Sequence, residues 1–247
     1  DKEHLGLIIK ILGEEKEAKK IANEIDKHRR KKPIENSKEL ALIVKKAKRK
    51  NISYKHAFGQ MNESGGEVDY NYRFRTGSIT KTFTATIIMQ LIEEDLLGID
   101  DFFLDLLNQN TREFLQDLLF LKGINYSKKI TIRHLLENRS GIRDSFTDDR
   151  FFNEVMRSPL KNWTWRNIME KYFEYKLNIK GSFIPGEGFY YSDINYLLLA
   201  VLIEQQTKMP FHLVLEKRIL GPLSLNDTYL EFYQEDKSSI PIVYPFY

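Results

Sequence analysis

The chain has 247 residues, of which 42% are hydrophobic and 30% are charged, and its formal net charge is +3. This composition excludes a disordered or collagen-like chain and predicts a globular protein that can build a full core. Because the sequence contains no cysteine, disulfides, thiol nucleophiles and thiolate metal sites are excluded. The longest apolar run, Tyr196–Ile203, is much shorter than the roughly 18–20 residues that a membrane span needs.

The N-terminal segment predicts a helix followed by sheet. Apolar residues recur at helical spacing within Glu14–Lys31, which indicates an amphipathic helix. Leu40–Val44 and Ile52–Phe58 are rich in residues that favour strands, and the polar segment Lys48–Asn51 fits the turn of an antiparallel hairpin between them. Gly59–Tyr72 is polar and contains two adjacent glycines, so we expect a loop there.

This segment also carries most of the positive charge. Residues 1–50 hold 16 Lys and Arg against 9 Asp and Glu, a net +7, whereas residues 51–247 hold 22 against 26, a net −4. The runs Lys27–Lys32 and Lys45–Lys50 fit a solvated helix end or a contact with an anionic surface, and a basic adaptor acting through residues 16–50 is a third reading. Residues 1–50 contain no aromatic side chain to stack on bases, so we expect no nucleic-acid partner.

A mainly helical region follows. Ile79–Glu94 and Ile194–Ile203 are strongly apolar and predict buried helices. The pattern also predicts helix N-caps at Thr131, Thr164 and Ser192, turns at Pro185–Gly186 and Gly221–Pro222, and a return to strand over Asp227–Phe232.

Several kinds of catalytic site are absent from the sequence. It contains no phosphate-binding loop, dinucleotide fingerprint, H-E-x-x-H zinc motif or G-x-S-x-G nucleophile turn. The five histidines are scattered, with no pair at the spacing of metal ligands, so we expect no metal site. His134 lies among apolar residues, where a hydrogen-bonded structural histidine is favoured over a catalytic one.

What remains is a serine followed three residues later by a lysine. Ser78 and Lys81 lie on one face if this segment is helical, because residues three apart are neighbours on a helix. A lysine amine can take the proton of a serine hydroxyl and so activate it as a nucleophile. Gly77 allows a sharp turn into the helix, which leaves the hydroxyl near unpaired backbone N–H groups that can stabilise an oxyanion.

The spacing by itself is weak evidence, because Ser158 and Lys161 repeat it. Ser158 precedes a proline and a polar segment, whereas Ser78 opens a strongly apolar helix, and this context favours Ser78. A second cluster, Pro185–Asp193, places tyrosine hydroxyls at the junction between a turn and an apolar helix. A tyrosine beside a lysine ammonium has a lowered pKa and can transfer protons, although the sequence holds 13 tyrosines and an ordinary core or surface role is the alternative.

Three blocks in order, Phe74–Thr86, Thr131–Ile142 and Pro185–Asp193, resemble the serine β-lactamase family of the class C and D-alanyl-D-alanine carboxypeptidase type, which includes esterases. The resemblance extends over about residues 39 to 232. It implies an α+β fold, with an antiparallel sheet flanked by helices plus a helical region, an active site at their junction, and no cofactor.

The resemblance also implies a role for each matching residue. Ser78 matches the nucleophile that forms an acyl-enzyme, and its backbone N–H matches one donor of the oxyanion hole. Lys81 matches the residue that activates the serine. Tyr191 matches the tyrosine that passes a proton to the leaving group and helps to deprotonate the deacylating water. The block Thr131–Ile142 matches a structural helix and turn, with no chemistry assigned to it.

The chain departs from the family pattern in two places. Asp193 stands where the family usually has a substrate-binding asparagine, and a carboxylate can accept a hydrogen bond but not donate one. If Asp193 approaches Lys81, it raises the pKa of the lysine and makes it a poorer base. The family's third motif, K-T-G or H-x-G, has no counterpart after Tyr191.

From that second departure we expect a single domain over residues 1–247 that is incomplete at its C-terminal end. Its sheet side is expected from residues 1–75 and 222–247, and its mainly helical part from residues 76–221. The leading hypothesis is a serine hydrolase that acts on an amide or ester of a small molecule or peptide. The alternative is a catalytically impaired relative that binds a peptide, cell-wall fragment or partner protein. The family resemblance favours an extracytoplasmic location.

Overall fold

The computed structural model describes residues 18–34, 37–47, 57–61, 65–158 and 160–243. The chain divides into two compact units, Asp1–Phe74 with Ile240–Tyr247, and Arg75–Ser239. Helices dominate both units, and the strands that are described form two short two-stranded ladders. This mixture of helices with a small amount of sheet confirms the α+β class that the sequence predicted.

The first unit contains a pair of packed helices, α2 (Ala18–Arg29) and α3 (Ser37–Ala47). Helix α2 confirms the amphipathic helix expected there. Helix α3 shows that the strand predicted over Leu40–Val44 was wrong. Ile43 of α3 packs with Ile21 and Ile25 of α2. The helical spacing of Ile43, Val44 and Ala47 places all three against α2, and this packing outweighs the preference of the segment for a strand. The other parts of the expected hairpin lie outside the described residues, except Ala57 and Phe58, which are not in a strand.

The basic run at the end of α2 takes the form of a solvated helix end. Arg30 pairs with Asp26 at 3.0 Å, and Lys32 pairs with Glu39 of α3 at 2.8 Å. His28 contacts the same Glu39 carboxylate at 3.0 Å. A contact of this run with an anionic surface stays a prediction.

The same unit holds a short parallel ladder. Strand β1 (Arg73–Phe74) pairs with β4 (Ile242–Val243), with Arg73 opposite Ile242. The Arg73 guanidinium donates a hydrogen bond to the carbonyl of Ile240 at 2.9 Å. The described parts of Gly59–Tyr72 form the expected loop, with one antiparallel bridge between Gln60 and Glu67.

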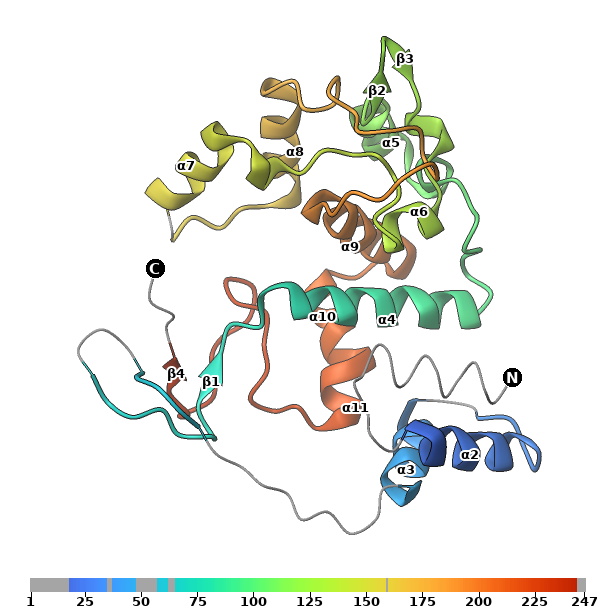
Figure 1. Ribbon diagram of the computed structural model, residues 1–247, viewed down its shortest axis with the longest axis vertical. Coiled ribbons are helices and arrows are strands. Elements are labelled where there is room, and N and C mark those ends of the chain that lie inside the picture. The colour runs from blue at the N-terminus through green and yellow to red at the C-terminus, as the bar shows by residue number, and fades with distance from the viewer. Residues whose placement is uncertain (1–17, 35–36, 48–56, 62–64, 159, 244–247) are drawn as a thin grey trace. The chain divides into compact units, whose positions relative to one another are not determined.

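The second unit is built around two apolar helices, α4 (Thr80–Glu93) and α9 (Asp193–Thr207), which run beside each other in Figure 1. Both were predicted from the apolar pattern. Their buried residues, such as Ile87, Leu91 and Leu198, belong to one continuous hydrophobic core. The remaining elements surround this pair: α5 (Gln109–Leu115), the hairpin β2 (Phe120–Leu121) with β3 (Ile124–Asn125), α6 (Ile132–Leu136), α7 (Asp149–Arg157), α8 (Trp165–Glu174), α10 (Phe211–Leu215) and α11 (Gly221–Leu223).

The expected helix caps are largely present. Thr131 accepts a hydrogen bond from the backbone of α6, and Thr164 does the same for α8. Ser192 stands at the N-cap position of α9, but its hydroxyl donates to the carbonyl of Arg143 at 3.3 Å instead of capping the helix.

Two predictions near the end of the unit were wrong. The expected turn at Gly221–Pro222 is helical, because α11 continues directly from the π-helical turn Glu216–Leu220 and the fixed φ of proline is compatible with a helix. Asp227–Phe232 forms turns and irregular backbone instead of a strand. The turn predicted at Pro185–Gly186 is present.

Candidate active site

Ser78 and Lys81 lie one turn apart at the start of the α4 helix. Ser78 belongs to a 3₁₀ turn, η1 (Gly77–Ile79), that leads directly into α4, and Gly77 enters it with a φ of +52°. Glycine suits this left-handed conformation because it has no Cβ. Lys81 Nζ donates a hydrogen bond to Ser78 Oγ at 3.1 Å. Ser78 is exposed, whereas the Lys81 side chain is only 17% exposed.

Tyr191 reaches the same serine from a distant part of the sequence. It lies in the extended segment just before α9, and its hydroxyl donates to Ser78 Oγ at 2.7 Å. Lys81 Nζ lies 4.9 Å from the centre of the Tyr191 ring. The alcohol, the amine and the phenol named from the sequence therefore meet at one accessible point.

Asp193 joins this group as the first residue of α9. Its Oδ1 lies 2.5 Å from Lys81 Nζ. Burial lowers the pKa of Lys81, but the hydrogen bonds to Asp193 and Tyr191 and the negative charge of the Asp193 carboxylate outweigh burial, so that the pKa lies above its ordinary value. The carboxylate therefore holds the lysine in its ammonium form, as the sequence analysis expected if the two residues approached each other.

A second carboxyl, that of Asp144, lies behind Asp193. The Asp193 backbone N–H donates to Asp144 Oδ1 at 3.2 Å, and the Asp144 residue is buried. Burial, followed by the nearby charge of Asp193, raises the pKa of Asp144 to about 6. The sequence analysis did not identify Asp144, because nothing in its local pattern shows that it is buried.

We expect Asp144 to make stability pH-dependent. Its pKa rises from 3.8 to about 6 on folding, which means that the folded state favours the protonated carboxyl. The stabilisation from Asp144 is therefore fully present below pH 4 and is lost as the pH rises through 6. A shift of about two pKa units corresponds to about 3 kcal/mol in the free energy of unfolding. Asp144→Asn does not lose this stabilisation, because asparagine does not ionise. Between pH 4 and pH 7 its free energy of unfolding should therefore rise by about 3 kcal/mol relative to that of the wild type, as measured by urea unfolding. If the difference in unfolding free energy between variant and wild type did not change with pH, the raised pKa of Asp144 would be contradicted.

The block Thr131–Ile142 positions the backbone on both sides of Tyr191. The carbonyl of Asn138 accepts from the N–H of Tyr190 at 2.9 Å, and its side-chain oxygen accepts from the N–H of Ser192 at 3.2 Å. The same oxygen accepts from the Asn195 amide at 2.9 Å. Asn138 adopts a φ of +55°, a conformation that asparagine tolerates better than most residues. The segment expected to be structural thus fixes the position of a candidate catalytic side chain.

Replacing Asn138 by alanine should destabilise the protein by about 2–4 kcal/mol. The change leaves the Ser192 N–H and the Asn195 amide without their buried acceptor, at about 1–3 kcal/mol for each unsatisfied group. Lys176→Ala is the matched control, because Lys176 also has a positive φ but is exposed, and it should change stability by less than about 0.5 kcal/mol. Urea unfolding gives the loss of stability in each variant. Equal losses in the two variants would show that the hydrogen bonds of the Asn138 side chain do not stabilise the protein.

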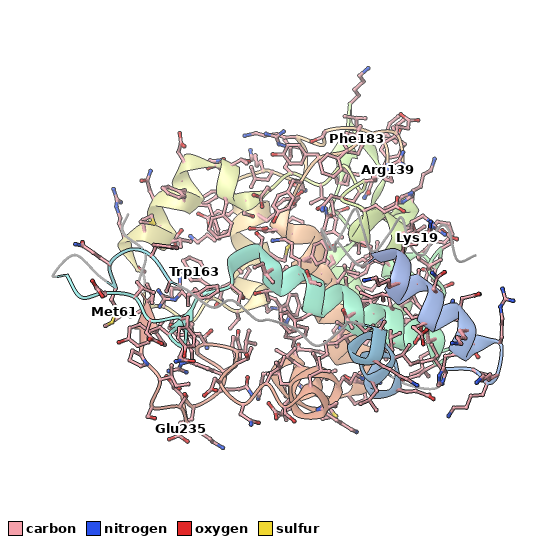
Figure 2. The ribbon with its side chains drawn as sticks, turned by 60° about the horizontal axis from the view of Figure 1, so that its bottom comes forward. Lys19, Met61, Arg139, Trp163, Phe183 and Glu235 are labelled. Carbon is pink, nitrogen blue, oxygen red and sulfur yellow. The ribbon has the colours of Figure 1, made fainter. Side chains whose placement is uncertain are left out.

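Two further contacts hold the loop before Tyr191 against this block. Arg139 and Phe183, both labelled in Figure 2, belong to the two segments involved. The Arg139 side chain donates to the carbonyl of Gly186, and its own carbonyl accepts from the Gly186 N–H at 2.9 Å. A Cβ at Gly141 would lie 2.2 Å from the carbonyl oxygen of Phe183, so only glycine fits there.

The other candidates from the sequence lie outside this arrangement. Ser158 ends α7 instead of beginning a helix, and Lys161 Nζ stacks over the Trp163 ring at 3.6 Å. His134 accepts a hydrogen bond from the Thr131 N–H at 3.2 Å and completes the cap of α6, which confirms its structural role.

The described residues contain neither a candidate metal site nor a candidate membrane span. In the described residues, no group of three or more histidine and acidic side chains is arranged to hold a metal ion. No helix in the described part of the chain has the length and apolar character needed to cross a bilayer.

Sequence comparison matches most of the chain to a known family. The Beta-lactamase family model matches residues 41–238, which is most of the chain. The chain belongs to the beta-lactamase family. This family comprises serine hydrolases, and its members similar to this chain include a penicillin-binding protein and a D-stereospecific amidohydrolase.

Curated relatives of this beta-lactamase family chain are much longer than it is. Penicillin-binding protein 4* of Bacillus subtilis (strain 168) is 31% identical over 183 residues, covering 72% of this chain and 35% of the relative. Protein flp of Staphylococcus aureus (strain MRSA252) is 30% identical over 171 residues, covering 68% of this chain and 29% of the relative. The chain therefore spans about a third of the length of these relatives.

Solved structures of the family share the fold. The D-stereospecific amidohydrolase from Streptomyces sp. is 28% identical, with a TM-score of 0.54 over 69% of this chain and 50% of that chain. The octameric penicillin-binding protein homologue from Pyrococcus abyssi is 26% identical, with a TM-score of 0.56 over 75% of this chain and 39% of that chain. The β-lactamase-like fold and family predicted from the sequence are confirmed.

Proposed function

We propose that the chain is a serine hydrolase that transfers the acyl group of an amide or ester first to Ser78 and then to water. The observation that carries this proposal is the pair of hydrogen bonds on Ser78 Oγ, from Lys81 Nζ at 3.1 Å and from the Tyr191 hydroxyl at 2.7 Å. A serine nucleophile needs groups within hydrogen-bond reach that accept its proton and return it to the leaving group. The neutral form of Lys81 and the Tyr191 hydroxyl would fill these two roles at an exposed serine.

The proposed reaction moves protons among these three groups. Neutral Lys81 takes the proton of the Ser78 hydroxyl while Oγ bonds to the substrate carbonyl carbon, and the carbonyl oxygen becomes an oxyanion near the Ser78 N–H. The bond to the leaving group then breaks as Tyr191 gives that group a proton, and the phenol regains a proton from the Lys81 ammonium. In the second step, water attacks the acyl carbon while its proton passes through the Tyr191 hydroxyl to neutral Lys81. The bond from the acyl carbon to Ser78 Oγ then breaks, and Oγ takes the proton back from the Lys81 ammonium, which releases the acid and restores the starting state.

One observation favours a second candidate function. The contact of 2.5 Å between Lys81 Nζ and Asp193 Oδ1 keeps the lysine protonated, and a protonated lysine cannot accept the serine proton. A chain held in this form would bind a peptide, a cell-wall fragment or a partner protein without turning it over. Turnover of nitrocefin or p-nitrophenyl acetate that is lost in Lys81→Ala would rule out this binding role.

Covalent labelling tests the hydrolase proposal. A fluorophosphonate or a fluorescent penicillin should label the wild-type chain, and Ser78→Ala should abolish the labelling. Ser158→Ala is the matched control, because it removes the serine of the second S-x-x-K sequence, which ends a helix, and it should label like the wild type. Labelling that persists in Ser78→Ala would remove Ser78 from the role of nucleophile.

A further inference from the structure

A cavity of about 250 Å³ lies next to the Ser78 site. Lys81 and Asp193 line it on the side of the site, and Thr80 and Thr84 of α4 continue the wall. The rest of the lining is mostly apolar and comes from α8, α9, α10 and the segment around Phe146: Phe146, Ile168, Leu197, Ala200 and Phe211. The cavity therefore combines one polar end with an apolar interior.

Lys81 connects this cavity to the candidate nucleophile. Its side chain lines the cavity, and its Nζ lies 3.1 Å from Ser78 Oγ. In an acyl-enzyme on Ser78, the substituent of the acyl group begins one bond from the carbonyl carbon. A substituent that passes Lys81 would enter the apolar interior, where burial of apolar surface favours it by roughly 25 cal/mol per Å².

The size and lining of the cavity limit what can occupy it. An apolar cavity of about 150 Å³ is sufficient to bind benzene. A cavity of about 250 Å³ has room for one aromatic ring or a branched aliphatic group, and a charged group would find charged partners only at the end lined by Lys81 and Asp193, not in the apolar interior. An acetyl group would leave most of this space empty.

We infer that this cavity is the subsite for the acyl substituent and that the chain prefers aromatic or branched aliphatic acyl groups to acetyl. This inference rests on the proposed acyl transfer to Ser78. Ala200 determines the size of the subsite, because a larger residue at this position of α9 would project into the space that the acyl substituent needs.

A series of p-nitrophenyl esters with one leaving group tests the inference on the wild-type chain. The value of kcat/KM should rise from acetyl to isobutyryl to phenylacetyl, with at least a tenfold gain overall, since even one methylene in an apolar pocket changes kcat/KM by about 10–200-fold. Values of kcat/KM that stay level or fall along the series would overturn the assignment of the cavity as the acyl subsite. This measurement needs no variant and so does not depend on whether one folds.

Ala200→Leu then tests whether the cavity causes the preference for phenylacetyl over acetyl esters. Filling the cavity should lower the phenylacetyl to acetyl ratio of kcat/KM at least tenfold. Thr86→Leu is the control, because it adds a leucine to an exposed position of α4 that does not line the cavity, and the ratio should stay within twofold of wild type. An unchanged ratio in Ala200→Leu would overturn the assignment of the cavity. Ester turnover that persists in Ser78→Ala would instead overturn the proposed function.

Discussion

Replacing Lys81 by methionine lowers the rate of acylation about 1,000-fold. Methionine retains much of the apolar length of the side chain but removes the amine that contacts Ser78 Oγ at 3.1 Å. General base catalysis contributes about 10²–10⁴-fold to a reaction of this kind. Removing the amine also leaves the carboxylate of Asp193 without its ion-pair partner. Stopped-flow measurement of acylation by an activated ester gives the rate of this step.

Lys161→Met is the matched control for this result. Lys161 is the lysine of the second S-x-x-K sequence, and its ammonium lies over the Trp163 ring, away from Ser78. We expect its acylation rate to stay within twofold of the wild type. An equal loss of rate in both variants, or no loss in Lys81→Met, would mean that Lys81 does not act on Ser78.

Asp193→Asn raises the acylation rate at pH 7 about tenfold. In the wild type, the hydrogen bond and the charge of Asp193 counteract the lowering effect of burial on the pKa of Lys81. Without this carboxylate, two of the contributions that raise the pKa of Lys81 are lost, so its pKa falls and more of the lysine is neutral at pH 7. The rise in kcat/KM with pH should therefore begin at a lower pH in the variant, because the neutral amine is the form that accepts the serine proton.

The exposed Asp149 provides the control for this change in charge. Asp149→Asn, in the first turn of α7, removes one exposed negative charge that is not among the groups that shift the pKa of Lys81, and it should leave the pH profile unchanged. A lower rate in Asp193→Asn, or a profile that moves to higher pH, would show that the ammonium form of Lys81 is the active one.

The local parts of the site could be predicted from the sequence. The three-residue spacing of Ser78 and Lys81 places both on one helix face, because helix geometry depends only on sequence separation. Gly77 and the apolar residues after it indicated where the helix begins. Tyr191 is 113 residues from Ser78, and only the resemblance to a family connected the two.

Residues that act through tertiary contacts were not predictable in this way. Asp144 and Asn138 acquire their roles when α9 packs beside the segment that contains them, and neither has a distinctive spacing. The error at Leu40–Val44 has the same origin, since packing of α3 against α2 overrides the strand preference of the segment. The assignment of Gly221–Pro222 as a turn failed because a proline is equally suited to the first turn of a helix.

The most direct test of the account is to identify the acylated residue. The intact chain is mixed with a slowly deacylating ester or penicillin, quenched with acid and digested, and the peptides are sequenced by mass spectrometry. The account predicts one added acyl mass, on Ser78. An adduct on Ser158 or on another residue, with Ser78 unmodified while substrate is consumed, would contradict it.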